Sequence, residues 1–144
     1  LCTAVTVHYI RKGKEARYML WRDEIAQIKA IVTDSAAYAA RMDALKKTPV
    51  LYIDDLFKGG QGEGGQFRAP TEADIKAAFE IINYRYNNPD LITIISSERT
   101  IGELSRIDEA IAGRIAERAK AAGYCLSIKR GPGRNWRLKD IEEV

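Results

Sequence analysis

The chain has 144 residues, 46% of them hydrophobic and 30% charged, which is the length and balance of one globular domain. Its formal net charge of +3 permits a nucleic-acid partner without requiring one. No apolar run reaches the roughly 18 residues that a membrane-spanning helix needs, and Cys2 and Cys125 follow no metal-binding spacing. We therefore expect a cytoplasmic protein with reduced thiols and no membrane partner.

Residues 1–47 predict four elements, three of them helical. The first twelve residues contain neither Gly nor Pro, and Gly13 is a residue at which such a helix ends. A short aromatic segment follows, which is typical of a strand. Apolar side chains then recur at helical spacing, with Asp34 as a good N-cap. The predicted elements are a helix over residues 1–12, a strand over 16–21, and helices over 24–32 and 35–47.

Two continuous apolar runs predict strands that are buried on both faces of a parallel sheet. Residues 50–53 form the first run and end in two aspartates, and residues 91–95 form the second and end in Ser-Ser-Glu. Between them, Thr71 and Asp74 have the spacing of a capping box and begin a helix that stops before Pro89. A strand, a helix and a strand in this order predict a right-handed βαβ unit.

The last third of the chain predicts one more helix and one more strand. Asp108 is an N-cap for a helix that ends at Gly123. Apolar side chains alternate over residues 124–128, which is typical of a strand, and a short hairpin arm is predicted at residues 135–138. The glycine-rich residues 59–65 predict a flexible loop inside the domain.

Asp54 and Asp55 follow the first buried strand in the Walker B pattern of apolar residues and then carboxylates. A buried strand fixes a carboxylate at its carboxyl end, where ligands bind in open α/β sheets. Asp54 is therefore a candidate Mg²⁺ ligand, usually through water, and Asp55 a candidate for polarising an attacking water. Because many strands end in Asp at a turn, this pair alone does not separate a catalytic site from a structural turn.

Polar and basic residues further along the chain could complete such a site. Ser97 and Glu98 end the second buried strand, where P-loop ATPases keep a polar sensor of the γ-phosphate. Arg114 and Arg118 lie four residues apart on one face of the next helix. Such a pair is either a solvated, ion-paired surface or an arginine finger directed at the ATP of a neighbouring subunit, and spacing alone does not decide.

Residues 50–56, 70–89 and 92–100 together resemble the DnaC/DnaI helicase loaders, most closely those of Gram-positive bacteria and their phages. Residues 112–118 are similar to the arginine-finger segment of that family. Residues 1–4 resemble the segment directly after its glycine-rich Lys-Thr loop. The resemblance covers nearly the whole chain, and its motifs are specific as a set.

This resemblance implies an α/β fold of the P-loop NTPase (AAA+) kind, a parallel sheet flanked by helices. It implies ATP hydrolysis with ATP and Mg²⁺ as cofactors, and a homo-oligomer that loads a replicative helicase onto single-stranded DNA in DNA replication. The roles it implies are Mg²⁺ binding for Asp54, the catalytic carboxylate for Asp55, the sensor for Ser97 or Glu98, and a finger acting in trans for Arg114.

The phosphate-binding half of such a site is missing from the sequence. The pattern G-x-x-x-x-G-K-[ST] occurs nowhere: the Gly13-Lys14 pair is not followed by a hydroxyl residue, and the loop at residues 59–65 has no lysine. The chain also begins with Leu1. We therefore expect residues 1–144 to be the C-terminal two-thirds of the ATPase domain, without its N-terminal strand and P-loop, and inactive alone.

Three other readings compete with the helicase loader. A transposition-helper ATPase of the IstB kind has the same chemistry and a different partner. A receiver domain also uses adjacent acids, but here the pair follows a late strand and no strand-end Asp comes after it. A non-catalytic module for single-stranded DNA would use the basic C-terminus and its aromatic residue. Those residues are Lys129, Arg130, Arg134, Arg137 and Lys139, with Trp136 among them.

Overall fold

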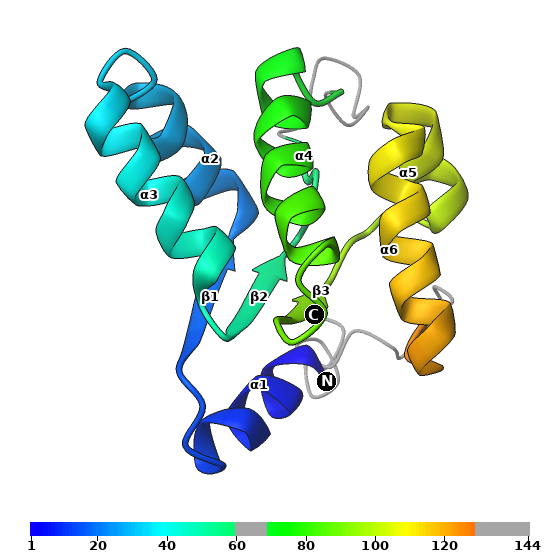
Figure 1. The fold of residues 1–144 in the computed structure, drawn as a ribbon. Helices are drawn as coiled ribbons and strands as arrows, with labels where there is room; N and C mark the ends of the chain where they lie inside the picture. Colours follow the sequence, from blue (N-terminus) through cyan, green and yellow to red (C-terminus); the bar gives the residue numbers. More distant parts are fainter. Residues whose placement is uncertain (60–68, 129–144) are drawn as a thin grey trace, which may run out of the picture.

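The computed structural model describes residues 1–59 and 69–128, which form an α/β arrangement of helices around a small parallel sheet (Figure 1). Among these residues, no helix combines the length and the apolar character that crossing a bilayer requires. In chain order the elements are α1 (Cys2–Arg11), β1 (Ala16–Leu20), α2 (Trp21–Ala30), α3 (Ser35–Lys47), β2 (Val50–Asp54), α4 (Glu72–Tyr86), β3 (Ile92–Ile95), α5 (Ile101–Ile107) and α6 (Glu109–Ala122).

The sheet has the strand order β1-β2-β3, and both pairings are parallel. The central strand β2 is the apolar run that the sequence singled out, and its first four residues are all buried. The register places Ile53 of β2 beside Met19 of β1 and Ile95 of β3. The carboxyl ends of all three strands therefore meet at one edge, as expected for a βαβ unit.

Helices cover the sheet from both sides. In Figure 1, α1 lies below the three strands, α2, α3 and α4 lie above them, and α5 and α6 lie to the right of α4. The core between these layers is apolar, and we take its burial as the main stabilising contribution. Its largest fully buried apolar side chains are Phe57, Met19, Met42, Leu45, Leu51, Ile53, Leu56, Ile81, Ile111 and Val50.

Arg85 of α4 is buried in this core, with 2% of its surface exposed. Its guanidinium donates hydrogen bonds to the carbonyl oxygens of Leu45, Lys46 and Thr48 at the end of α3, at 3.2, 2.9 and 2.8 Å. It also donates to the carbonyl of Ile92 and to the hydroxyl of Thr93 in β3. Burial lowers the pKa of Arg85 to about 10, so the side chain is still charged at neutral pH. The hydrogen bonds of Arg85 therefore link α4 to α3 and to β3.

The local signals for helix ends are confirmed. Asp34 accepts a hydrogen bond from the backbone of Ala37, and Thr71 forms the predicted capping box with Asp74. Asp108 caps α6, and Gly123 ends it with a φ of +69°, a conformation that suits glycine. These signals are reliable because each depends on residues three or four positions apart.

Two expectations about elements are corrected, and one helix was not expected. The helix predicted over residues 24–32 begins earlier, at Trp21, and ends at Ala30. The short helix α5 was not expected, although Thr100 and Glu103 form a capping box at its start. Residues 124–128 form no strand. A strand needs a hydrogen-bonding partner, and no described strand pairs with this segment, so its alternating side chains Tyr124, Leu126 and Ile128 stay exposed.

Other expectations fall outside the described residues. They are the glycine-rich loop from residue 60 onward, the hairpin arm at residues 135–138, and the basic residues from Lys129 to Lys139 with Trp136.

Candidate functional site

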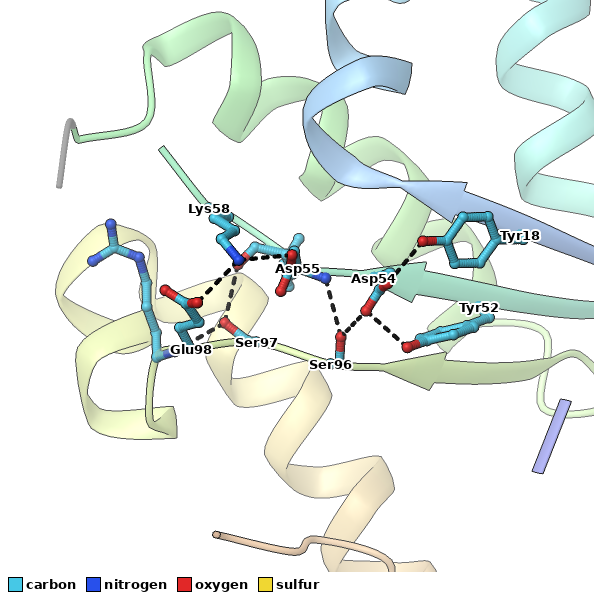
Figure 2. A network of polar contacts seen from close by, with 10 residues as sticks. Tyr18, Tyr52, Asp54, Asp55, Lys58, Ser96, Ser97 and Glu98 are labelled. Carbon is cyan, nitrogen blue, oxygen red and sulfur yellow. Dashed lines mark hydrogen bonds and ion pairs between the residues drawn. The ribbon is translucent and has the colours of Figure 1, made fainter. Parts of the chain in front are cut away.

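The candidate site lies where β2 and β3 end, and Figure 2 shows its side chains. Asp54 is the last residue of β2, and Ser96 directly follows β3. Because the two strands are parallel neighbours, these residues from distant parts of the sequence come into contact. The backbone N–H of Ser96 donates to the carbonyl of Ile53, and the N–H of Leu56 donates back to the carbonyl of Ser96, so the two strand ends are fixed to each other.

Asp54 accepts hydrogen bonds from three hydroxyl groups (Figure 2). Tyr52 donates to Oδ1 at 2.7 Å, and Ser96 donates to the same oxygen. Tyr18 donates to Oδ2 at 2.8 Å. Tyr52 precedes Asp54 by two residues and therefore shares its face of the strand. Tyr18 is the register partner of Tyr52 on β1, and their rings meet edge to face with centroids 5.3 Å apart.

These contacts favour an ionised Asp54. Partial burial acts to raise the pKa of this carboxyl, but the hydrogen bonds from Ser96, Tyr52 and Tyr18 outweigh it, and the pKa lies below its ordinary value. Burial and the hydrogen bond to Asp54 raise the pKa of Tyr52 to about 12. Within residues 1–59 and 69–128 no lysine or arginine forms an ion pair with Asp54. Its charge is stabilised by neutral donors.

The Asp54 carboxylate, with the hydrogen bonds it accepts, fits a hydrated Mg²⁺ ion. A carboxylate offers about four lone-pair positions, and the three hydroxyls occupy three of them. One position is left for a water molecule of a hydrated cation, and Mg²⁺ commonly binds through one or two carboxylates while keeping several waters. Asp54 is therefore the residue of this site that would hold such an ion, through water.

Asp55 leaves the strand in an unusual backbone conformation, with a φ of +58°. Its N–H donates to the hydroxyl of Ser96 at 3.0 Å, so Ser96 contacts both aspartates. Its carboxylate Oδ2 lies 3.0 Å from the ammonium nitrogen of Lys58, which also lies 3.0 Å from Oε1 of Glu98 (Figure 2). The three side chains form a bridge across the ends of β2 and β3.

Ser97 is also at this edge, but its hydroxyl is engaged by the backbone. It donates to the carbonyl of Leu56 at 3.0 Å and accepts from the N–H of Arg99 at 3.1 Å. Of the two candidates for the sensor, Glu98 is therefore the one whose side chain contacts Lys58 and, through it, Asp55.

Arg114 lies elsewhere, between α6 and α4. It donates to Oδ1 of Asn83 at 2.8 Å, and its guanidinium lies over the rings of Phe79 and Tyr86, 5.0 and 5.6 Å from their centroids. Arg118 donates to the carbonyl of Pro89. No contact joins either arginine to Asp54, Asp55 or Glu98 in the described part of the chain.

The sequence did not identify four residues of this network as functional. Tyr52 carried a usable signal, because it stands two positions before Asp54 on a strand. Ser96 stands directly after the second strand, but the prediction named the two residues that follow it, Ser97 and Glu98, as candidates for the sensor. Tyr18 and Lys58 reach the aspartates only through strand pairing and a tight turn, which no spacing in the sequence reveals.

Fold and site together define the chain as an α/β domain with a cluster of acidic and hydroxyl side chains at the carboxyl edge of a parallel sheet. The chain is 37% identical over 116 residues to the uncharacterized protein YqaM of Bacillus subtilis (strain 168). It is 42% identical over 96 residues to the phage-like element PBSX protein XkdC of the same organism.

These alignments cover 80% and 67% of this chain, but only 34% of each relative, so the chain spans about a third of the length of the curated relatives it matches. No family model matches the chain, and no solved structure matches it significantly.

Proposed function

We propose that the chain carries the metal-binding and water-activating half of an ATP-hydrolysing site, in an AAA+ protein of the helicase-loader type. The observation that supports this best is the pair Asp54 and Asp55 at the carboxyl end of a buried parallel strand, both bound by Ser96 of the neighbouring strand. Ligand sites of open α/β sheets lie at this edge.

The two aspartates would have different tasks in hydrolysis. Asp54 would hold Mg²⁺ through water, and the bound ion would neutralise charge on the phosphate oxygens. The hydroxyls of Tyr18, Tyr52 and Ser96 would keep the carboxylate of Asp54 ionised and in one orientation. Asp55 is exposed enough to reach solvent and would accept a hydrogen bond from the attacking water, orienting it towards the γ-phosphorus.

The cradle for the phosphates is the part of the site that these residues do not supply. Gly13 and Lys14 precede β1, so they lie at the amino edge of the sheet, opposite Asp54. The proposal therefore applies to a polypeptide that also carries a glycine-rich Lys-Thr or Lys-Ser loop, as the greater length of both relatives allows.

The partners proposed for this protein are a replicative helicase, single-stranded DNA and further copies of itself. The similarity to a protein of a phage-like element supports a role in such an element. Arg114 acting on a neighbouring subunit's ATP belongs to the same proposal.

The test is Asp55→Asn in the complete natural polypeptide. Asparagine tolerates the positive φ of this position, so the backbone turn should persist. We expect ATP turnover to fall by about 100-fold or more while ATP binding stays nearly unchanged, because the lost charge lies beside the attacking water and Lys58 keeps its ion pair with Glu98. Asp43→Asn on α3, which removes the ion pairs with Lys46 and Lys47, is the matched control and should keep full turnover. Normal turnover in Asp55→Asn, or a wild-type protein without ATPase activity, would contradict the proposal.

A further inference from the structure

Lys58 forms ion pairs with Asp55 and Glu98, and the mechanism proposed above gives it no role. Its ammonium nitrogen lies 3.0 Å from Asp55 and 3.0 Å from Glu98. An ammonium group has three donors, and these carboxylates use two. The side chain is 40% exposed, so a ligand oxygen can approach the third donor.

A strained backbone turn holds Lys58 in this position. The N–H of Lys58 donates to the carbonyl of Asp55 at 2.9 Å and closes a tight turn. Within that turn Phe57 has a φ of +59°, which is unfavourable for a bulky side chain. Phe57 is buried and packs edge to face on Trp21, with ring centroids 5.2 Å apart, which fixes the strained conformation. Strain of this kind clusters at functional sites.

Negative charge gathers at this edge when ATP binds, and Mg²⁺ at Asp54 would offset only part of it. Asp54, Asp55 and Glu98 are three carboxylates, and a γ-phosphate would bring more negative charge. Asp55 and Glu98 raise the pKa of Lys58, so its ammonium remains protonated. Arg99 lies nearby, but its Nε donates to the carbonyl of Phe57.

We propose that Lys58 is a catalytic residue that binds the γ-phosphate of ATP, and that Glu98 is a positioning residue that holds the Lys58 ammonium in place. This inference rests on the proposed ATPase function and names its γ-phosphate ligand. As the bond between the water oxygen and the γ-phosphorus forms, the bond from that phosphorus to the bridging oxygen of ADP breaks. The water proton passes towards Asp55, while Lys58 keeps its protons and stabilises the charge on the phosphoryl oxygens.

The geometry also assigns different importance to Lys58 and Glu98. If Glu98 itself sensed the phosphate or the water, its neutralisation would be the more damaging change. If it only positions Lys58, then Glu98→Gln leaves the ammonium near Asp55 and should lower turnover only several-fold. Lys58→Met removes the phosphate contact and should lower turnover about 100-fold.

The experiment measures hydrolysis, and binding of Mg²⁺-ATP and Mg²⁺-ADP, for the complete natural polypeptide and both variants. Because ADP lacks the γ-phosphate, Lys58→Met should bind ATP about tenfold more weakly and ADP unchanged. Lys47→Met is the matched control, because it removes an exposed lysine paired with Asp43 on α3, and should match wild type in every assay.

Three outcomes would overturn the inference while leaving the ATPase proposal intact. They are normal turnover in Lys58→Met, equal weakening of ATP and ADP binding, and a larger loss of turnover in Glu98→Gln than in Lys58→Met. A wild-type protein that neither binds nor hydrolyses ATP would overturn both proposals together. Thermal melting of each variant identifies a simple loss of folding, and in that case Lys58→Gln, which keeps a polar side chain, replaces Lys58→Met in the same comparison.

Discussion

Tyr18 donates a hydrogen bond to Asp54 although the two residues are 36 positions apart and belong to different strands. The register of β1 against β2 places Tyr18 beside Tyr52, and both hydroxyls then reach the same carboxylate. Two tyrosines and Ser96 thus hold one charge at the edge of the sheet. The stability of the protein should therefore depend on the protonation of Asp54.

Ser96→Ala should destabilise the protein at neutral pH and much less in acid. The pKa of Asp54 is lower in the folded chain than the ordinary carboxyl value of 3.8. Its contribution is therefore fully present above that value and is lost as the pH falls through the folded pKa. We expect Ser96→Ala to lower the free energy of unfolding by about 1–2 kcal/mol at neutral pH, and by less at an acid pH below 3.8, as measured by urea titration.

Ser97→Ala is the control for this experiment. Ser97 contacts only uncharged backbone groups, so the cost of its removal should not change with pH. A cost of Ser96→Ala that stays constant between the two pH values would show that Asp54 is not the group responsible.

Tyr52 should be among the last tyrosines to ionise. Its folded pKa of about 12 exceeds the ordinary value of 10, so the neutral phenol stabilises the fold fully below pH 10, and this contribution is lost as the pH rises towards 12. In an absorbance titration of phenolate, Tyr52→Phe should remove a step near pH 12. A titration of Tyr52→Phe that keeps the step near pH 12 would contradict this assignment.

Arg85→Leu should be severely destabilising. It leaves the buried carbonyls of Leu45 and Thr48, and the partly buried carbonyl of Ile92, without this donor, and we expect the free energy of unfolding to fall by about 3–5 kcal/mol. Arg85→Lys should recover little, because an ammonium has three donors on a single atom and cannot reach acceptors on α3 and β3 together. Chemical denaturation measures both. A loss below about 1 kcal/mol in Arg85→Leu would show that water replaces these contacts.

Arg114→Ala should lower stability by about 1–2 kcal/mol, because it removes the contact with Asn83 and the stacking on Phe79 and Tyr86. Arg118→Ala, which loses one exposed backbone contact, should change it by less than about 0.5 kcal/mol.

The finger role of Arg114 requires a separate measurement. Subunits with Arg114→Ala mixed with Asp55→Asn subunits should regain part of their ATPase activity, because one mixed interface keeps both functional halves. If verified mixed assemblies show no recovery, Arg114 has the structural role alone.

The sequence by itself determined the features that depend on neighbouring residues. The apolar run of β2 predicted a buried strand, Asp34, Thr71 and Asp108 predicted helix starts, and Asp54 with Asp55 predicted an acidic strand end. Each of these signals spans a few positions, so local backbone geometry and hydrogen bonding are enough to read them.

The tertiary structure alone decided which side chains meet. Strand register brought Tyr18 and Ser96 to Asp54, and a strained turn placed Lys58 between Asp55 and Glu98. Packing of α6 on α4 brought Arg114 to Asn83. Residues 124–128 alternate like a strand but pair with none of the described strands. Apart from the Lys58–Asp55 pair, which spans three positions, the deciding interactions join segments distant in sequence, and their energy exists only once the chain has folded.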